Sequence, residues 1–169
     1  MIFIWKILFS SKVVSSDLET QNVTKQNVDC STVLKLGVQG TSMFPLVKNW
    51  AILDYYPDYF KCHEIEVWDV VTYDYGWNKL PLIKKIMAWP WDKFVYNWSQ
   101  ILINDVVLVN SVWKPYNIKS KVIDLYAKNY PLIPKDTYLL LGDQPWWTTD
   151  SSIFWLIHKS NVFWKVKLN

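Results

Sequence analysis

The sequence predicts a mainly β protein, built as a barrel or as a pair of packed sheets. Two observations support this prediction. From residue 33 to the C-terminus, most apolar segments are short, rich in β-branched and aromatic residues, and separated by turn residues. In that region only residues 119–128 have a pattern that suits a helix. A chain of 169 residues fits one domain that buries a sizeable core and carries a small excursion.

The expected strands follow one another with turns between them. Residues 33–38 alternate loosely, whereas 51–55 and 69–73 are β-branched and aromatic. A turn at 76–78 separates them from 80–87, and three meander strands then begin a β excursion over about 97–134. In chain order we expect strands at 33–38, 51–55, 69–73, 80–87, 93–96, 100–103, 106–109, 137–141, 153–157 and 162–168.

Residues 1–32 are expected to precede the folded domain, which we place at 33–169. Residues 1–9 are apolar but contain Lys6, and they are too few for a membrane span of about 20 residues. They suit the remnant of a truncated anchor, a foot in the membrane interface or a terminal strand. A cleaved signal peptide is disfavoured because no clear small-x-small site follows. Residues 10–32 are polar and aperiodic, which predicts a linker.

Composition argues against several partners. The net charge of +3 is mild and no block of like charges occurs, so we expect no nucleic-acid partner. All 18 basic residues are lysine, so the bidentate fork of arginine is absent. Cys30 and Cys62 can pair, stay reduced or play no role, and we favour a structural or incidental one. Cys62-His63 resembles one pair of metal ligands, but no second Cys/His pair follows, so we expect no metal and no other cofactor.

Tryptophan is unusually frequent and glycine unusually rare, with 12 and 4 residues respectively. Trp50 and Trp98 each follow an asparagine between expected strands, where Asn-Gly would make a tight turn. Tryptophan is sterically poor at the left-handed position of such a turn. We hypothesise that the gene uses UGA as a glycine codon and was translated as though UGA meant tryptophan. If every tryptophan except Trp5 stands for glycine, the chain has 15 glycines, an ordinary number.

Ser42 is a candidate nucleophile because it lies on a predicted turn just before Pro45, which prevents a helix from starting. A serine hydroxyl needs a base. Neither histidine has a triad pattern, whereas Lys84 lies among apolar residues. Burial would lower the lysine pKa from its usual value of about 10.4, so that the amine could accept a proton. Strand alternation points Lys85 the other way, toward solvent or an acid.

Four segments resemble the motif boxes of type I signal peptidases, in the order in which that family has them. Residues 40–45 (GTSMFP) resemble G-x-S-M-x-P, and 68–71 (WDVV) resemble G-D-V-V. Residues 84–92 (KKIMAWPWD) resemble K-R-V-x-G-x-P-G-D, and 142–155 resemble G-D-N-x-x-x-S-x-D-S-R-x-x-G. The resemblance covers roughly residue 33 to the C-terminus. The family pattern has glycine at Trp68, Trp91 and Trp155, in agreement with the recoding hypothesis.

The resemblance implies a role for each matching residue. Ser42 would be the nucleophile and Lys84 the general base, and Thr148 would hydrogen-bond the lysine amine. The other supporting residues would be Gly142, Asp143, Asp150 and Ser151. The substrate would be bound by Val38, Gly40, Met43, Leu82 and Ile83, for which core packing is the competing role. 

Two departures from the family pattern matter. Ser152 replaces an arginine, so an acid–arginine bridge is lost, and Lys85 is expected to pair with one carboxylate instead. Gly40 supplies no hydroxyl to the oxyanion hole, so backbone N–H groups, including that of Ser42, would hold the developing charge.

The implied protein has a signal-peptidase-like β fold, related to that of the self-cleaving SOS repressors. It would be a serine endopeptidase that removes signal peptides from preproteins at sites with small residues. Its location would be the bacterial cytoplasmic membrane, with the catalytic domain at the membrane surface on the extracytoplasmic face. One alternative is another serine–lysine protease, either a conjugation-type processing enzyme or a self-cleaving repressor. The other is a non-catalytic, aromatic-rich β module that binds carbohydrate or lipid through true tryptophans.

Overall fold

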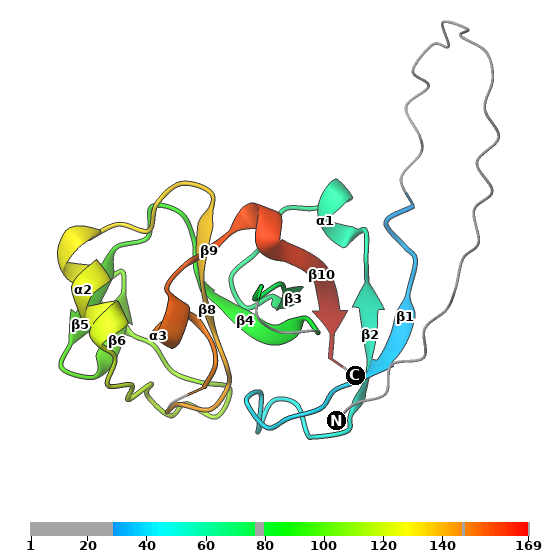
Figure 1. Ribbon diagram of the computed structural model, residues 1–169, viewed down its shortest axis with the longest axis horizontal. Coiled ribbons are helices and arrows are strands. Elements are labelled where there is room, and N and C mark those ends of the chain that lie inside the picture. Colours follow the sequence, from blue (N-terminus) through cyan, green and yellow to red (C-terminus); the bar gives the residue numbers. More distant parts are fainter. Residues whose placement is uncertain (1–28, 77–79, 147, 169) are drawn as a thin grey trace, which may run out of the picture.

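Strand β4 (Leu82–Ala88) runs through the middle of the molecule in the computed structural model (Figure 1). The structure describes residues 29–76, 80–146 and 148–168. The first part of β4 pairs antiparallel with β3 (Val70–Tyr73), and its second part pairs antiparallel with β8 (Thr137–Leu141). From residue 84 onward β4 is buried, because both of its faces are covered. This strand therefore connects two parts of the core.

The larger sheet has seven strands in the order β1-β2-β10-β3-β4-β8-β9, and each neighbouring pair is antiparallel. Its remaining strands are β1 (Leu34–Gly37), β2 (Ile52–Tyr56), β9 (Ile157–His158) and β10 (Val162–Lys167). The short helix α1 (Tyr59–Cys62) follows β2, and a 3-10 turn (Lys159–Asn161) precedes β10. Among the described residues, no helix has both the length and the apolar character to cross a bilayer.

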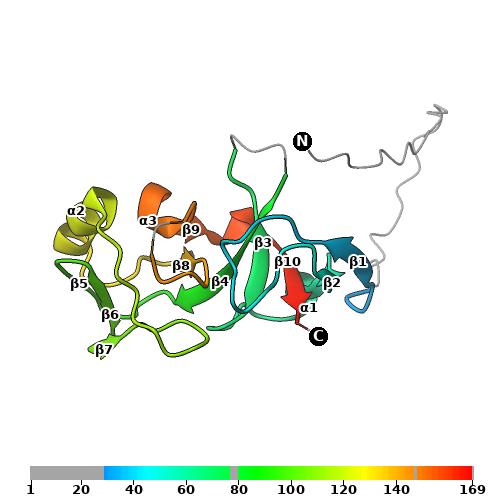
Figure 2. The ribbon, with the colours of Figure 1, turned by 90° about the horizontal axis from the view of Figure 1, so that it is seen from below.

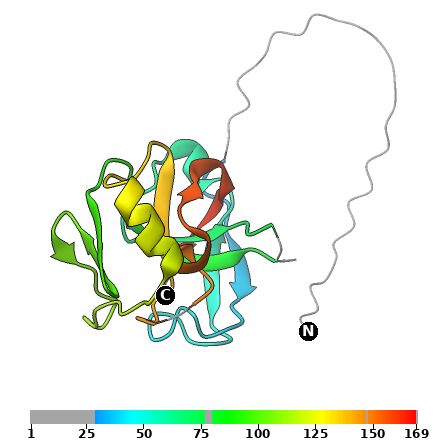
Figure 3. The same ribbon diagram turned by 60° about the vertical axis from the view of Figure 1, so that its left-hand side comes forward.

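A smaller sheet lies at the other end of the molecule from β1 and β2 (Figure 2). It contains β5 (Phe94–Asn97), β6 (Gln100–Ile103) and β7 (Val106–Val107). Helix α2 (Lys121–Asn129) packs against β5 and against α3 (Ser151–Phe154) (Figure 3). The core of this part includes buried side chains from β4 and β8, namely Met87, Ala88, Leu139 and Leu141. The smaller sheet is thus built directly onto the central strands.

The predicted mainly β fold class is confirmed, and the expected strands lie within about two residues of their places except at two positions. The strand expected at 106–109 is only Val106–Val107, and the strand expected at 153–157 is wrong. There the Asp150 carboxylate accepts the N–H of Ser152 at 2.9 Å and caps α3. Helices α1 and α3 were not expected. The interpretations of residues 1–28 and of the turn at 77–78 fall outside the described residues.

Among the residues that the structure describes, six tryptophans have a positive φ, between 59° and 74°. Glycine is the residue that adopts this conformation routinely, and a bulky side chain there is strained. Trp98 is the first residue of the two-residue connection between β5 and β6, where a type II′ turn takes glycine. These φ values support the recoding hypothesis at six positions: Trp50, Trp68, Trp91, Trp98, Trp113 and Trp155.

We expect Trp98→Gly and Trp113→Gly each to raise the free energy of unfolding by about 0.5–1 kcal/mol. Both side chains are highly exposed, at 91% and 84%, so little packing is lost. Glycine relieves a left-handed strain of about 1–2 kcal/mol, partly offset by a freer unfolded chain. Trp164→Gly is the control and should destabilise, because Trp164 lies in β10 and packs edge-on against Tyr55. Chemical denaturation measures all three, and equal destabilisation by all of them would contradict the strain argument.

UGG codons at the strained positions would end the recoding hypothesis.

Cys30 and Cys62 form a disulfide with a Cα–Cα distance of 6.2 Å. The bond joins the segment before β1 to the end of α1. It closes a loop of 32 residues and so restricts the unfolded chain. The structure therefore selects the first of the three roles left open for these cysteines.

We expect Cys62→Ser to lower the free energy of unfolding by about 3 kcal/mol under oxidising conditions. Cys30→Ser should have the same effect, because either change removes the same bond. A reducing agent should lower the stability of the native protein to that of the variants and leave the variants unchanged. Urea unfolding with and without reductant tests this, and a native protein insensitive to reductant would contradict it.

Candidate active site

Ser42 lies on the loop between β1 and β2, and backbone hydrogen bonds hold this loop in place. Within the loop, the N–H of Phe44 donates to the carbonyl of Thr41 at 2.9 Å. The Ser42 carbonyl accepts the N–H groups of Asp143 at 2.9 Å and Gln144 at 3.3 Å. Among the described residues, the N–H of Ser42 makes no hydrogen bond. The serine is thus fixed through its carbonyl, while its N–H is left available.

Lys84 reaches Ser42 from the central strand β4. Its side chain is 1% exposed, and its Nζ lies 2.7 Å from Ser42 Oγ and 2.9 Å from the carbonyl oxygen of Ile83. Burial lowers the pKa of Lys84 to about 8, against an opposing effect of the Asp150 charge. Above that pH most of the amine is neutral, and a neutral amine can accept the serine proton.

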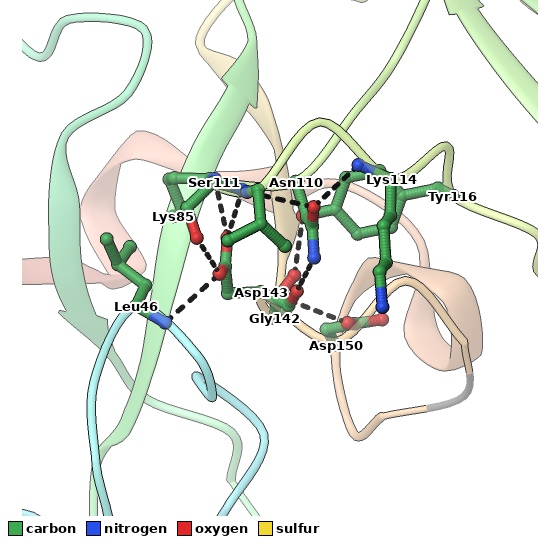
Figure 4. Close-up of polar contacts among 10 residues, drawn as sticks. Leu46, Lys85, Asn110, Ser111, Lys114, Tyr116, Gly142, Asp143 and Asp150 are labelled. Carbon is green, nitrogen blue, oxygen red and sulfur yellow. Dashed lines mark hydrogen bonds and ion pairs between the residues drawn. The ribbon is translucent and has the colours of Figure 1, made fainter.

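Lys85 points to the opposite face of β4 and meets an acid there (Figure 4). Its Nζ lies 2.9 Å from Asp143 Oδ1, and both side chains are almost fully buried. Asp143 Oδ2 also accepts the N–H of Leu46 at 3.2 Å. Leu46 lies in the loop between β1 and β2 that carries Ser42, here called the nucleophile loop. A buried ion pair is tolerated when its remaining polar atoms are satisfied in this way. The expected pairing of Lys85 with a carboxylate is therefore present.

The Asp150 carboxylate organises the other side of the site. It accepts the N–H of Gly142 at 2.9 Å and the hydroxyl of Thr148. The expected contact between Thr148 and the Lys84 amine is not found among the described residues, and the Thr148 hydroxyl donates its proton to the Asp150 carboxylate. A charged oxygen is the stronger acceptor. Thr148 therefore acts on Asp150, which influences Lys84 through its charge.

Gly142 and Ser151 support this arrangement through the backbone. A Cβ atom at Gly142 would overlap the carbonyl oxygen of Ser42 and would lie 2.8 Å from Thr148 Oγ1. Only glycine allows this close approach of the two loops. The Ser151 hydroxyl oxygen accepts the N–H of Leu140 at 3.0 Å, which attaches α3 to β8.

The residues expected to bind substrate fall into two groups. Val38 and Met43 are 7% and 2% exposed and pack in a core cluster with side chains of β2, β3 and β10, so they offer little surface to a substrate. Gly40 is exposed, and Leu82 and Ile83 are half-buried. The pairing of β8 with β4 begins at residue 85, so the edge of residues 82–84 on that side has no strand partner among the described residues.

Two residues near the site were missed by the sequence analysis. Asn110 and Ser111 follow the smaller sheet, and Ser111 donates to both carboxylate oxygens of Asp143. Their segment has no motif, and their approach to Asp143 depends on how the smaller sheet packs. A sequence pattern gives no signal for such a contact.

Fold and site together define a β-sheet protein in which a serine hydroxyl faces a buried lysine amine. A serine beside a lysine also occurs in variants of the hydrolase triad. A family model described as "Signal peptidase, peptidase S26" matches residues 28–169. The chain therefore belongs to the signal peptidase family, peptidase S26.

A search of solved structures found similarity to a signal peptidase I from Enterococcus faecalis V583. The two are 17% identical, the match covers 59% of this chain and 94% of that chain, and the TM-score is 0.45. No curated protein matched the sequence.

We expect the Lys84 amine to titrate near pH 8, well below an ordinary lysine, because burial disfavours its charged form. Asp150→Asn should lower this pKa further, since it removes a negative charge but keeps an acceptor oxygen. Asp124→Asn, on the exposed pair with Lys128, should leave it unchanged. Side-chain ¹³Cε and ¹⁵Nζ NMR shifts follow the titration directly. A Lys84 that titrates near 10.4 would contradict the argument.

Proposed function

We propose that this protein is a signal peptidase I-like serine endopeptidase that cleaves signal peptides from preproteins, with Ser42 as nucleophile and Lys84 as base. The observation that carries the proposal is the 2.7 Å contact between Ser42 Oγ and Lys84 Nζ, with the lysine 1% exposed. Membership of the peptidase S26 family supports it. No second function is favoured by a specific observation.

The reaction begins when the neutral Lys84 amine removes the Ser42 proton as Oγ attacks the scissile carbonyl carbon. The tetrahedral intermediate collapses as the C–N bond breaks, and the Lys84 ammonium gives its proton to the leaving amine. An acyl-enzyme ester on Ser42 remains. Lys84, neutral again, takes a proton from water, whose oxygen attacks the ester. The acid product leaves as the proton returns to Ser42 Oγ.

The developing oxyanion is the demanding part of this reaction. The backbone N–H of Ser42 is the donor best suited to it, since that group makes no hydrogen bond among the described residues. Gly40 has no side chain to add a second donor, and its own N–H is bound to Asn49 Oδ1 at 2.9 Å. Loss of one oxyanion donor costs about 3 kcal/mol in other hydrolases. We therefore propose a slow enzyme.

The substrate would bind as an extended strand along the open edge of β4 at residues 82–84. This edge leads directly to Lys84, so a peptide paired with it would pass close to Ser42 Oγ. Leu82 and Ile83 are half-buried beside this path and favour small substrate side chains before the cut. That preference suits the A-x-A-like sites of signal peptides.

We propose that the catalytic domain works at the outer surface of a bacterial cytoplasmic membrane. The Cys30–Cys62 disulfide supports an oxidising compartment. Large apolar side chains on β1, β2 and the nucleophile loop support a surface that meets lipid. They are Leu34, Leu36, Phe44 and Ile52, with exposed fractions of 40–64%.

We expect Ser42→Ala and Lys84→Ala each to reduce cleavage of a signal-peptide substrate in detergent by at least about 10³-fold. Lys35→Ala is the matched control, because Lys35 is exposed and pairs with Asp54 far along β1. The wild-type rate should rise with pH through about 8, as Lys84 loses its proton. The assay follows the cleaved product over a pH series. Activity that survives in either dyad variant would refute the proposed mechanism.

A further inference from the structure

Residues 110–117 join the smaller sheet to the active-site loop 142–145. This segment follows β7, and no catalytic motif falls on it. Three hydrogen bonds connect it to carbonyl oxygens of the loop: Asn110 Nδ2 to Asp143 at 2.9 Å, the Tyr116 hydroxyl to Gly142 at 2.7 Å, and the Asn117 N–H to Pro145 at 2.7 Å. The smaller sheet is thus fastened to the loop that carries Asp143.

Ser111 binds the Asp143 carboxylate at two points (Figure 4). Its backbone N–H donates to Oδ1 at 3.0 Å, and its hydroxyl donates to Oδ2. An arginine guanidinium offers two parallel donors to a carboxylate in a comparable way. This chain has no arginine, and position 152 is a serine. Ser111 therefore offers two donors to the Asp143 carboxylate, as an arginine would, but from its backbone N–H and its hydroxyl.

Asn110 holds Ser111 in position. Its side chain is 3% exposed, and its Oδ1 accepts the N–H of Val112 at 3.1 Å and the N–H of Lys114 at 2.9 Å. These bonds tighten the turn on which Ser111 lies. Ser111 itself is exposed, so a change of its side chain disturbs little of the core.

Asp143 passes this restraint on to the nucleophile loop. Its backbone N–H donates to the Ser42 carbonyl at 2.9 Å, and its Oδ2 accepts the N–H of Leu46 at 3.2 Å. The orientation of Asp143 therefore influences both ends of the stretch 42–46. If the Asp143 carboxylate loses the Ser111 hydroxyl as a donor, it can rotate about its side-chain bonds. The loop at 42–46, which is bonded to Asp143, then shifts with it.

We propose that Asn110 and Ser111 are positioning residues for the Ser42–Lys84 pair, acting through Asp143. Ser111 contacts neither Ser42 nor Lys84, so its effect depends on how it orients the carboxylate. This inference rests on the proposed function, because it concerns the rate of the same reaction. The smaller sheet would then contribute to the reaction, because residues 110–117, between β7 and α2, hold the loop that carries Asp143 and through it the nucleophile loop.

The test compares Ser111→Ala with Ser111→Thr. Loss of a hydroxyl bonded to a charged group should reduce kcat roughly tenfold, with KM changed less than about twofold. Threonine keeps both donors and should restore kcat to within about threefold of wild type. Ser99→Ala, at a half-buried serine in the turn between β5 and β6 and outside this network, is the control and should behave as wild type. Asn110→Ala should lower kcat in the same direction as Ser111→Ala.

A second measurement separates this role from a general loss of folding. Ser111→Ala should slow the phosphonylation of Ser42 by a fluorophosphonate probe, in which Oγ displaces fluoride from phosphorus, by the same factor as kcat, while every molecule is finally labelled. Ser111→Ala should lower the melting temperature by no more than about 4 °C, because it removes one hydrogen bond to a carboxylate that keeps its other donors. A lower final labelling would indicate misfolding and overturn the proposal.

The proposal is also overturned if Ser111→Ala keeps the wild-type kcat or if threonine fails to restore it. If Ser42→Ala and Lys84→Ala abolish cleavage while Ser111→Ala has no effect, only the positioning role fails. If the dyad variants retain cleavage, the proposed function fails and this inference fails with it.

Discussion

Two adjacent buried lysines on opposite faces of one strand determine the character of this site. Lys84 and Lys85 are 1% and 3% exposed, and a charge at such depth must be compensated or given up. Lys85 is compensated by direct contact with Asp143. Within the described part of the chain, the Lys84 amine hydrogen-bonds to a hydroxyl and a carbonyl only, and Asp150 acts on it through its charge. The strand therefore carries one lysine in a direct ion pair and one whose pKa falls to about 8.

The loops of the site depend on this difference between the two lysines. The ion pair of Lys85 fixes Asp143, and Asp143 binds the carbonyl of Ser42 through its N–H. Removal of one partner of a buried ion pair leaves an uncompensated charge, which costs about 3–5 kcal/mol. The ion-paired Lys85 thus has a structural role: it fixes Asp143, which holds the loop of Ser42 beside Lys84. Successive side chains of a strand point to opposite faces, so β4 can place Lys84 beside Ser42 and Lys85 beside Asp143.

Much of this could be predicted from the sequence, and the misses share a cause. The alternation of Lys84 and Lys85 is a local property of a strand, and so are most strand positions. Thr148 was expected to hydrogen-bond Lys84, but its hydroxyl donates to the Asp150 carboxylate. Helix α3 is found at the start of the strand expected at 153–157, because the Asp150 carboxylate caps its N-terminus. Ser111 reaches Asp143 only through the packing of two sheets, which no local pattern encodes.

The strained tryptophans bear on the site because three of them adjoin its elements. Trp68 precedes β3, Trp91 lies in the turn after β4, and Trp155 ends α3, each with a φ of 73° or 74°. A bulky residue with positive φ is maintained only where the surrounding structure determines the backbone strongly. The hydrogen bonds of these turns do so, since the N–H of Trp91 donates to the carbonyl of Ile133 and that of Trp68 to Ile86. The backbone path that glycine would follow is therefore set by β3, β4 and α3, so the site geometry does not depend on the tryptophan side chains. Glycine at these positions would relax the strain and leave Lys84 where it is.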